Sequence, residues 1–185
     1  MPDALHPAGH APGRAPKDAP SRLITVTHVH HTGFTVASLL QSLPFWTDVL
    51  GFELVGTDTL KRPDFVEQVT GVADAEISVA MVAGAGQIIE LLEYTRPSDR
   101  RDLRYRACDT GAAHIALIVD GLDALVDRAR PYGWVPLGNP QTVPEGPWAG
   151  RRVIYVRGPD GVTIEFVELA RPSEGPAEAT LQTRK

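Results

Sequence analysis

Hydrophobic and polar positions along the chain follow two different periods, which predicts strands alternating with helices. Two β-prone runs each open with a histidine and carry a valine five positions later, His31–Val36 and His114–Val119. Each run precedes a helix-like stretch that ends in a glycine between two large apolar residues, Leu50-Gly51-Phe52 and Tyr132-Gly133-Trp134. The glycines follow the histidines by 20 and 19 residues. This recurrence indicates an internal repeat.

Each half then ends in strand-like runs joined by short turns. We expect strands over residues 52–57, 75–82, 87–94, 153–157 and 162–169. Glycine-containing turns at 83–86 and 158–161 separate the last two strands of each half. The final runs share one pattern, IELLE and IEFVE, which places Glu90 and Glu165 at equivalent positions. The sequence therefore predicts an α+β fold of two similar modules, each with a strand, a helix and about three further strands.

The local signals also predict where the two helices begin and end. In the second half Asp120 is the expected N-cap, and Pro131 and Gly133 are expected to end the helix. The apolar positions that share one face of this helix are Leu122, Leu125, Val126 and Ala129. In the first half Pro44 would break a helix interior. We therefore expect Ser42 to cap a shorter helix that holds Pro44 in its first turn.

The composition divides the chain into five segments. Residues 1–20 are rich in Pro, Ala and Gly and predict a disordered tail, because they offer little apolar surface to bury. Residues 171–185 predict a flexible tail of similar character. Between the tails, the first module is expected over 21–96, a linker over 97–111 and the second module over 112–170.

Composition and charge exclude several classes of protein. The 185 residues are 43% hydrophobic and 22% charged, as in a folded globular domain, and no apolar run approaches the length of a membrane span. A net charge of −5 argues against a general nucleic-acid binder. Cys108 is the single cysteine, so an internal disulfide is impossible. Because the first residues lack the pattern of a signal peptide, we expect a cytoplasmic protein.

The repeat brings two histidines and two glutamates to matching places. If the modules pack about a pseudo-twofold axis, His31, Glu90, His114 and Glu165 converge and supply two imidazoles and two carboxylates. This donor set suits a divalent transition metal such as Ni, Co, Zn, Mn or Fe. An inward-facing carboxylate without a cation would be costly, so an inward pair implies a metal or another cation.

Each of these residues also has a purely structural interpretation. A single histidine on a strand is more often a hydrogen-bonded structural residue, and a glutamate in an apolar strand more often faces solvent. The joint recurrence of both types favours a metal site. His28 and His30 compete with His31, and the match to His114 through the valine five positions later selects His31.

The segments that carry these residues resemble one known superfamily. The strings VHHTGFTVASLLQSLPFWTDVLGFELV, GQIIELLEY, GAAHIALIVDGLDAL and GPDGVTIEFVE are similar to the vicinal oxygen chelate proteins, which include glyoxalases, methylmalonyl-CoA epimerases, extradiol dioxygenases and bleomycin-resistance proteins. The similarity covers about residues 23–170. It implies paired βαβββ modules that form a half-open eight-stranded barrel around a metal, with ligands at His31, Glu90, His114 and Glu165. It also implies a homodimer, since some members dimerise and build sites across the interface.

The resemblance implies a reaction as well. The four-ligand pattern resembles lactoylglutathione lyases, which implies a metal-dependent isomerase, epimerase or lyase that removes a proton next to a carbonyl. By this analogy Glu165, alternating with Glu90, is the expected catalytic base. Methylmalonyl-CoA epimerases often carry glutamine at the position of Glu90 and a base glutamate on the preceding strand. Here that strand offers only Glu76, at its margin.

Two alternatives from the same superfamily remain open. An Fe(II) extradiol dioxygenase uses two histidines and one carboxylate, and a second carboxylate at Glu90 would crowd that arrangement. A drug-binding resistance protein sequesters its ligand without metal or catalysis, but such proteins usually lack the four ligands.

Two loops bear on the substrate. One loop is rich in arginine, at Arg96, Arg100, Arg101, Arg104 and Arg106, and Arg151 and Arg152 flank another. These side chains predict a small-molecule substrate that is anionic or a thioester, although a solvated basic loop is the alternative. The segment 139–150 is rich in Pro and Gly and contains Trp148, which is expected to act in a lid or to pack on a dimer partner.

Overall fold

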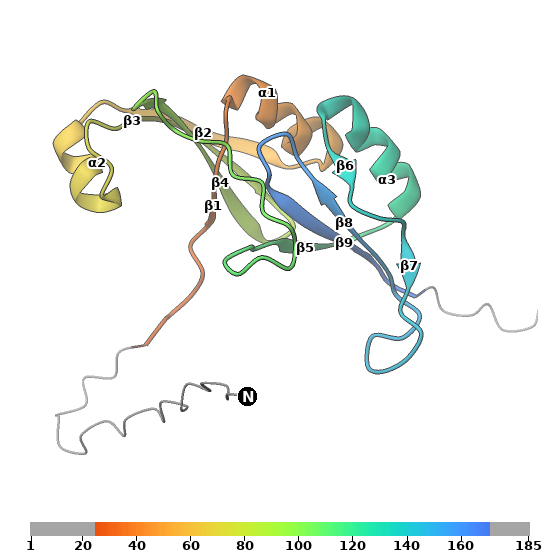
Figure 1. The fold of residues 1–185 in the computed structure, drawn as a ribbon. Coiled ribbons are helices and arrows are strands. Elements are labelled where there is room, and N and C mark those ends of the chain that lie inside the picture. The colour runs from red at the N-terminus through yellow and green to blue at the C-terminus, as the bar shows by residue number, and fades with distance from the viewer. Residues whose placement is uncertain (1–24, 171–185) are drawn as a thin grey trace, which may run out of the picture.

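The strands form two separate sheets with the same order (Figure 1). The computed structural model describes residues 25–170, so the predicted tails at 1–20 and 171–185 lie outside the described residues. The first sheet has the order β1-β4-β3-β2 and contains β1 (Thr32–Thr35), β2 (Glu53–Leu60), β3 (Glu76–Gly84) and β4 (Gln87–Arg96). The second sheet has the order β5-β9-β8-β6, with β7 beside β8, and contains β5 (Ile115–Val119), β6 (Val135–Pro136), β7 (Gln141–Thr142), β8 (Arg152–Arg157) and β9 (Thr163–Glu168). The predicted α+β class is confirmed.

The two sheets repeat one pairing scheme. In each, the first strand runs parallel to the last, β1 with β4 and β5 with β9, whereas the last two strands form an antiparallel hairpin. A parallel pair needs a long crossover, and a helix supplies it in both modules. The crossover contains α1 (Leu39–Pro44) and the π-helical turn η1 (Phe45–Val49) in the first module. It contains α3 (Leu122–Ala129) and the 3₁₀ turn η2 (Arg130–Tyr132) in the second.

The repeated glycines end these helices. Gly51 and Gly133 have φ of 73° and 80°, the left-handed conformation that glycine adopts without steric cost. This turn sends the next residue, Phe52 or Trp134, back into the core, where each is less than a tenth exposed. The pattern of a glycine between apolar residues is therefore a signal for where each helix stops.

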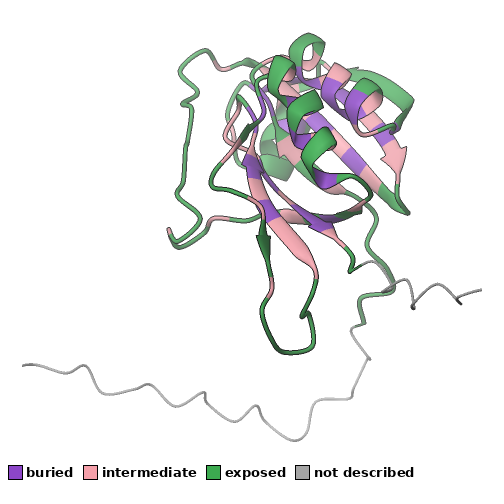
Figure 2. Cartoon of the chain, turned by 90° about the vertical axis from the view of Figure 1, so that its right-hand side faces the viewer, coloured by how far each residue is buried: buried purple, intermediate pink, exposed green. Residues whose placement is uncertain are grey.

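One apolar core joins the two modules. In Figure 1, α1 and α3 lie side by side over the sheets, and the ring of Phe45 stacks on Trp134 with centroids 3.9 Å apart. Polar contacts cross the same boundary: Arg128 donates to the carbonyl oxygen of Asp48 at 2.6 Å, and Asp160 accepts from the Ala37 N–H at 2.8 Å. Buried residues follow the strands and the sheet-facing sides of the helices (Figure 2). The modules are thus fastened through their helix-covered sides.

The faces of the sheets that point away from this core are called the open faces below. Along β4, Ile89 and Leu91 are fully buried in the core, so Glu90 lies on the open face by strand alternation. Along β9, Ile164 and Phe166 are likewise buried, and Glu165 lies on the open face. Both candidate glutamates are therefore directed away from the contact between the modules.

The predicted cap of the first helix is wrong. Helix α1 begins at Leu39, with Ser38 at the cap position four residues before the expected one, and Ser42 is a buried residue within the helix. Its hydroxyl donates to Asp160 Oδ2 at 3.0 Å. The acceptor for the helix start is Glu93 Oε2, which receives the Leu39 N–H at 2.8 Å. A carboxylate from the neighbouring strand replaces the local cap, and no local pattern reveals it.

The predicted cap of α3 is wrong for the same reason. The N-cap residue is Gly121, with φ of 72°, rather than Asp120. Glu168 Oε1 accepts the N–H groups of Gly121 at 2.9 Å and Leu122 at 3.1 Å. The predicted apolar face of this helix is confirmed, since Leu122, Val126 and Ala129 are buried in the core. The second glutamates of IELLE and IEFVE thus serve the helix starts in both modules.

One helix was not predicted. Helix α2 (Pro63–Thr70) is inserted between β2 and β3 and lies at the far end of the first sheet (Figure 1). Its proline at the first position and the left-handed Gly71 at its end are ordinary helix boundary signals. Val66 packs against Ile77 and Val79 in a second apolar cluster. Val79 and its strand partner Leu92 lie on the open face of the first sheet. Since Val66 of α2 packs against Val79, the inserted helix covers part of that face.

Candidate metal centre

The first histidine and glutamate form a close pair. His31 Nε2 lies 3.1 Å from Glu90 Oε2, with the two side chains 35% and 22% exposed. His31 directly precedes β1, and two residues later Gly33 lies opposite Glu90 in the parallel register. A Cβ at Gly33 would lie 3.4 Å from Glu90 Oε2, so the glycine leaves room for the carboxylate. These two residues are called the first half-site.

The second histidine and glutamate repeat this geometry. His114 Nε2 lies 3.3 Å from Glu165 Oε2, with the two side chains 39% and 22% exposed. His114 directly precedes β5, and two residues later Ala116 lies opposite Glu165. These two residues are called the second half-site. Each offers one imidazole nitrogen and one carboxylate to the same point in space, which is the donor chemistry of a divalent transition metal.

The neighbouring histidines lie outside the first half-site. His30 Nδ1 is 2.7 Å from His31 Nδ1, on the side of the His31 ring opposite Nε2. His28 Nδ1 contacts Thr27 Oγ1 at 3.0 Å. His31 is therefore the residue of the three whose Nε2 faces Glu90, and its role as a metal ligand stays a prediction.

The two half-sites do not combine into one cluster within a single chain. Across residues 25–170, no group of three or more His, Cys, Asp or Glu side chains is placed to hold a metal ion. Each half-site supplies two donors, whereas zinc-type sites generally take three or four protein ligands. The modules contact each other through their helices, and that contact does not bring the open faces together. A metal site with all four predicted ligands would therefore require more than this arrangement of one chain.

The second half-site contains a residue that sequence reasoning missed. Tyr155 on β8 lies opposite Glu165 in the antiparallel register, and its hydroxyl is 3.3 Å from His114 Nε2. Burial raises the pKa of the Tyr155 phenol, and the nearby Glu165 carboxylate raises it further. The register of the β8–β9 hairpin is the signal that could have found it. At the equivalent place in the first module Met81 lies opposite Glu90.

Glu76, the alternative base, belongs to a different cluster. Its carboxylate lies 3.7 Å from the guanidinium of Arg96, which also pairs with Asp74. This ion-pair group closes the ends of β3 and β4 beside α2. Glu76 is thus engaged in a structural contact in its own module.

Several arginines of the 97–111 segment bind the chain itself. Arg100 donates to the carbonyl oxygen of Ala37 at 3.1 Å, and Arg104 donates to that of Pro159 at 2.8 Å. Arg106 pairs with Asp109 at 2.7 Å. The contacts of Arg100 and Arg104 fasten the segment to the first and the second module, and the Arg106 pair lies within the segment. These contacts favour a structural role for the three side chains over the predicted recognition of an anionic substrate.

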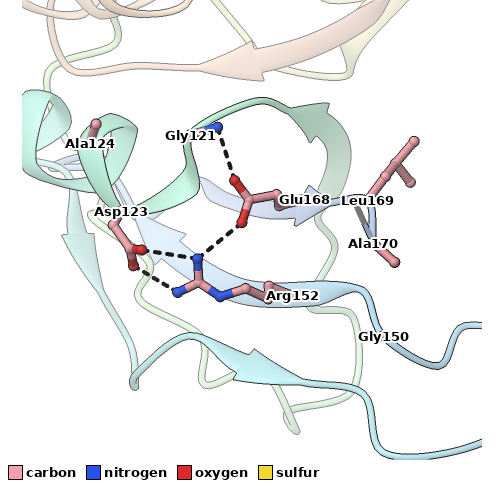
Figure 3. A pocket seen from close by; sticks show the side chains of 8 residues that line it. All are labelled: Gly121, Asp123, Ala124, Gly150, Arg152, Glu168, Leu169 and Ala170. Carbon is pink, nitrogen blue, oxygen red and sulfur yellow. Dashed lines mark hydrogen bonds and ion pairs between the residues drawn. The ribbon is translucent and has the colours of Figure 1, made fainter. Parts of the chain in front are cut away.

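A hollow beside α3 is lined by charged side chains that are hydrogen-bonded to one another (Figure 3). It has a volume of about 420 Å³, and its lining includes no half-site residue. Arg152 donates to Asp123 and to Glu168, each at 2.9 Å. The Leu122 N–H and Arg152 hold the pKa of Glu168 below its usual range, and Arg152 does the same for Asp123. This network stabilises the start of α3 and leaves no free charged group for chemistry.

The loop between β7 and β8 projects from the second sheet (Figure 1). Trp148 in this loop is 57% exposed, and the guanidinium of Arg151 lies 4.2 Å from its ring centroid. The roles of this loop as a lid or a dimer contact stay predictions. Among the described residues, no helix has the length and apolar character needed to cross a membrane.

Known proteins are similar to this chain over both modules. Residues 28–166 match the family described as Glyoxalase/Bleomycin resistance protein/Dioxygenase superfamily. A 2-epi-5-epi-valiolone epimerase from Actinomyces sp. is 37% identical over 84% of this chain and 86% of the relative. A probable lactoylglutathione lyase from Vibrio parahaemolyticus serotype O3:K6 is 30% identical over 78% of this chain and 93% of the relative. A glyoxalase family protein from Bacillus cereus has the same fold, with a TM-score of 0.69 at 21% identity, over 82% of this chain and 99% of that one.

Proposed function

Because the chain belongs to the Glyoxalase/Bleomycin resistance protein/Dioxygenase superfamily, we propose that it is a metal-dependent epimerase that moves a proton on the carbon next to a carbonyl group. The observation that carries this proposal is the pair of equivalent half-sites, His31 with Glu90 and His114 with Glu165. The 37% identity to an enzyme named as an epimerase of 2-epi-5-epi-valiolone favours inversion of a carbon centre in a ketone.

The donor set suits a divalent metal, and both half-sites are needed to hold it. We propose that a second copy of the chain completes the site, so that the first half-site of one protomer meets the second half-site of its partner. Two observations support this arrangement: each half-site has only two donors, and both lie on open faces directed away from the helix contact. The half-open eight-stranded barrel would then combine one sheet from each protomer in a homodimer.

The glutamates carry the proton transfers in this scheme. A bound divalent metal supplies Lewis acidity, which polarises a carbonyl oxygen and is worth several kcal/mol. Glu165, as the carboxylate, removes the proton from the adjacent carbon, and Glu90, in its protonated form, donates its proton to the opposite face of that carbon. Exchange with solvent then removes the proton from Glu165 and restores the one on Glu90. General base catalysis of this kind typically contributes about 10²- to 10⁴-fold in rate. Glu165 and Glu90 are each 22% exposed, so both carboxylates are accessible to a substrate on the open faces.

A lactoylglutathione lyase is the second candidate, favoured by the relative that is 30% identical. It needs the same proton abstraction next to a carbonyl, and it differs in the substrate and in where the proton returns. The arginines of the 97–111 segment that would bind an anionic thioester are partly engaged with backbone carbonyls. That engagement favours an uncharged ketone as the substrate.

The proposal is tested by metal analysis of protein purified without a histidine tag, followed by turnover in D₂O. We expect one bound divalent metal for each pair of half-sites, and inversion of 2-epi-5-epi-valiolone with deuterium at the inverted carbon. Turnover of the methylglyoxal–glutathione hemithioacetal alone would replace the epimerase with the lyase. Oxygen uptake with catechols would indicate a dioxygenase, and tight ligand binding by metal-free protein without turnover would indicate a resistance protein.

A further inference from the structure

The two half-sites contain the same ligand types, yet the strand beside each glutamate presents a different side chain. Tyr155 lies opposite Glu165, whereas Met81 lies opposite Glu90. We propose that the Tyr155 hydroxyl donates a hydrogen bond to the substrate's carbonyl oxygen, and so fixes which way round the substrate binds. This inference rests on the proposed function and adds a substrate-orienting residue to it.

The geometry directs the phenol to the second half-site. Directly opposed residues of an antiparallel pair project from the same face of a sheet, so Tyr155 and Glu165 share the open face. The ring of Tyr155 lies against the ring of His114, with centroids 4.8 Å apart and planes inclined by 39°. The hydroxyl thereby reaches His114 Nε2 at 3.3 Å. The phenol oxygen and the Glu165 carboxylate approach the same nitrogen.

That nitrogen cannot serve the phenol and a metal together. His114 Nε2 either carries one proton or offers one lone pair, and an imidazole nitrogen that binds a metal has neither to share. Within the described residues, His114 Nε2 is the only hydrogen-bond partner of the Tyr155 hydroxyl. A metal bound at His114 would therefore leave the Tyr155 O–H free to donate to another acceptor, such as a substrate oxygen.

The first half-site cannot provide the same contact. The Met81 thioether has no hydrogen to donate, and it packs with Leu92 in the apolar cluster beneath α2. A carbonyl oxygen therefore gains a donor only at the second half-site. This places the carbon next to the carbonyl beside Glu165 and the remainder of the substrate toward the apolar side of the site.

The test uses Tyr155→Phe, which removes only the hydroxyl, with Tyr132→Phe as the matched control. Tyr132 packs against the main core on the helix side. Zn²⁺ binding is measured by calorimetry on the full chain, and acetohydroxamate, a small chelating oxygen anion, is then titrated into the Zn²⁺-loaded protein. We expect Tyr155→Phe to bind Zn²⁺ within about twofold of wild type and acetohydroxamate about three- to tenfold more weakly, as for loss of one hydrogen bond. Tyr132→Phe should match wild type in both titrations.

A second readout leaves Tyr155 in place. The chain has 4 tyrosines, so incorporation of 3-fluorotyrosine gives few ¹⁹F signals, and Tyr155→Phe identifies the signal from Tyr155. This signal should move when Zn²⁺ is added and move again with acetohydroxamate, whereas that of Tyr132 should not. Unchanged acetohydroxamate affinity in Tyr155→Phe, or a ¹⁹F signal insensitive to acetohydroxamate, would overturn the role of Tyr155 and leave the metal site standing. Wild-type protein that binds no metal would overturn the proposed function and this inference with it.

Discussion

The first and second half-sites resemble each other in their ligands and differ in their surroundings. In both, a histidine just before a parallel strand meets a glutamate on the adjacent strand, at 3.1 Å in the first and 3.3 Å in the second. The open face beside the first is apolar and partly covered by α2, with Met81 and Leu92 packed there. The open face beside the second carries Tyr155.

The repeat thus supplies the same donors twice, whereas the residue opposite each glutamate supplies an asymmetry that an epimerase would need. An epimerase must treat the two faces of one carbon differently at any moment, because one group removes a proton while another returns one. Identical half-sites would bind a substrate equally well in two orientations. The apolar side chains beside the first half-site and the Tyr155 hydroxyl beside the second would give one orientation an advantage.

The largest expected effect tests what the half-sites share. Replacing His31 or His114 by alanine should remove bound metal and lower turnover by about 10³-fold or more, because several kcal/mol of Lewis-acid stabilisation are lost. Metal content by mass spectrometry and kcat on the same samples check this expectation.

His28→Ala is the matched control, since His28 precedes the same strand and contacts Thr27 instead of Glu90. It should keep both metal and turnover. Metal loss in His28→Ala but not in His31→Ala would show that the ligand of the first module was assigned to the wrong histidine.

The next effect tests how the half-sites differ. Glu165→Gln should slow both epimerisation and exchange of the substrate proton with D₂O by about 10²- to 10⁴-fold, because the base is lost. Glu90→Gln should slow epimerisation while exchange continues, because Glu165 still removes the proton. Deuterium exchange followed by NMR, with metal content as the control, separates the two outcomes. Equal loss of exchange in both variants would contradict the division of roles.

Much of this site could be predicted from local patterns. Periodicity located the strands around Glu90 and Glu165, and the recurrence of His31 and His114 at matching offsets selected these residues. The residue opposite Glu165 could not be found in this way. The side chain that faces a given glutamate depends on the register of a hairpin, which the sequence pattern leaves open by one or two positions.

The predicted helix caps were wrong for a related reason. The expected caps, Ser42 and Asp120, are close in sequence to the helices. The carboxylates that accept the N–H groups at the helix starts are instead Glu93 and Glu168, from neighbouring strands. These carboxylates lie 54 and 47 residues away from the N–H groups that they accept. The parallel pairing of the first and last strands of each module brings these glutamates next to the helix starts. A tertiary contact therefore caps each helix in place of a residue that is local in sequence.

A smaller effect compares these two caps. Glu93→Ala and Glu168→Ala should each lower the Tm by about 2–4 °C, the size expected for losing a helix cap. Glu168→Ala should have the larger effect, because Glu168 also holds Arg152. Thermal unfolding of both variants at neutral pH measures the difference, and a greater loss in Glu93→Ala would contradict it.

The pH dependence of the Glu168 cap follows from its pKa. The Leu122 N–H and Arg152 keep the pKa of Glu168 below its usual 4.5 in the folded protein. The carboxylate therefore adds stability that is fully present above the unfolded pKa and is lost as the pH falls through the folded pKa. The Tm difference between wild type and Glu168→Ala should be constant near neutral pH and shrink below about pH 4.

The most direct test of the account is complementation between two inactive proteins, His31→Ala and His114→Ala, mixed and refolded together. If each site joins the first half-site of one protomer to the second half-site of its partner, a mixed dimer contains one site with both defects and one intact site. Half of the dimers are mixed, so metal content and turnover should recover to about a quarter of wild type. A mixture no more active than the two variants measured separately would contradict a site shared between protomers.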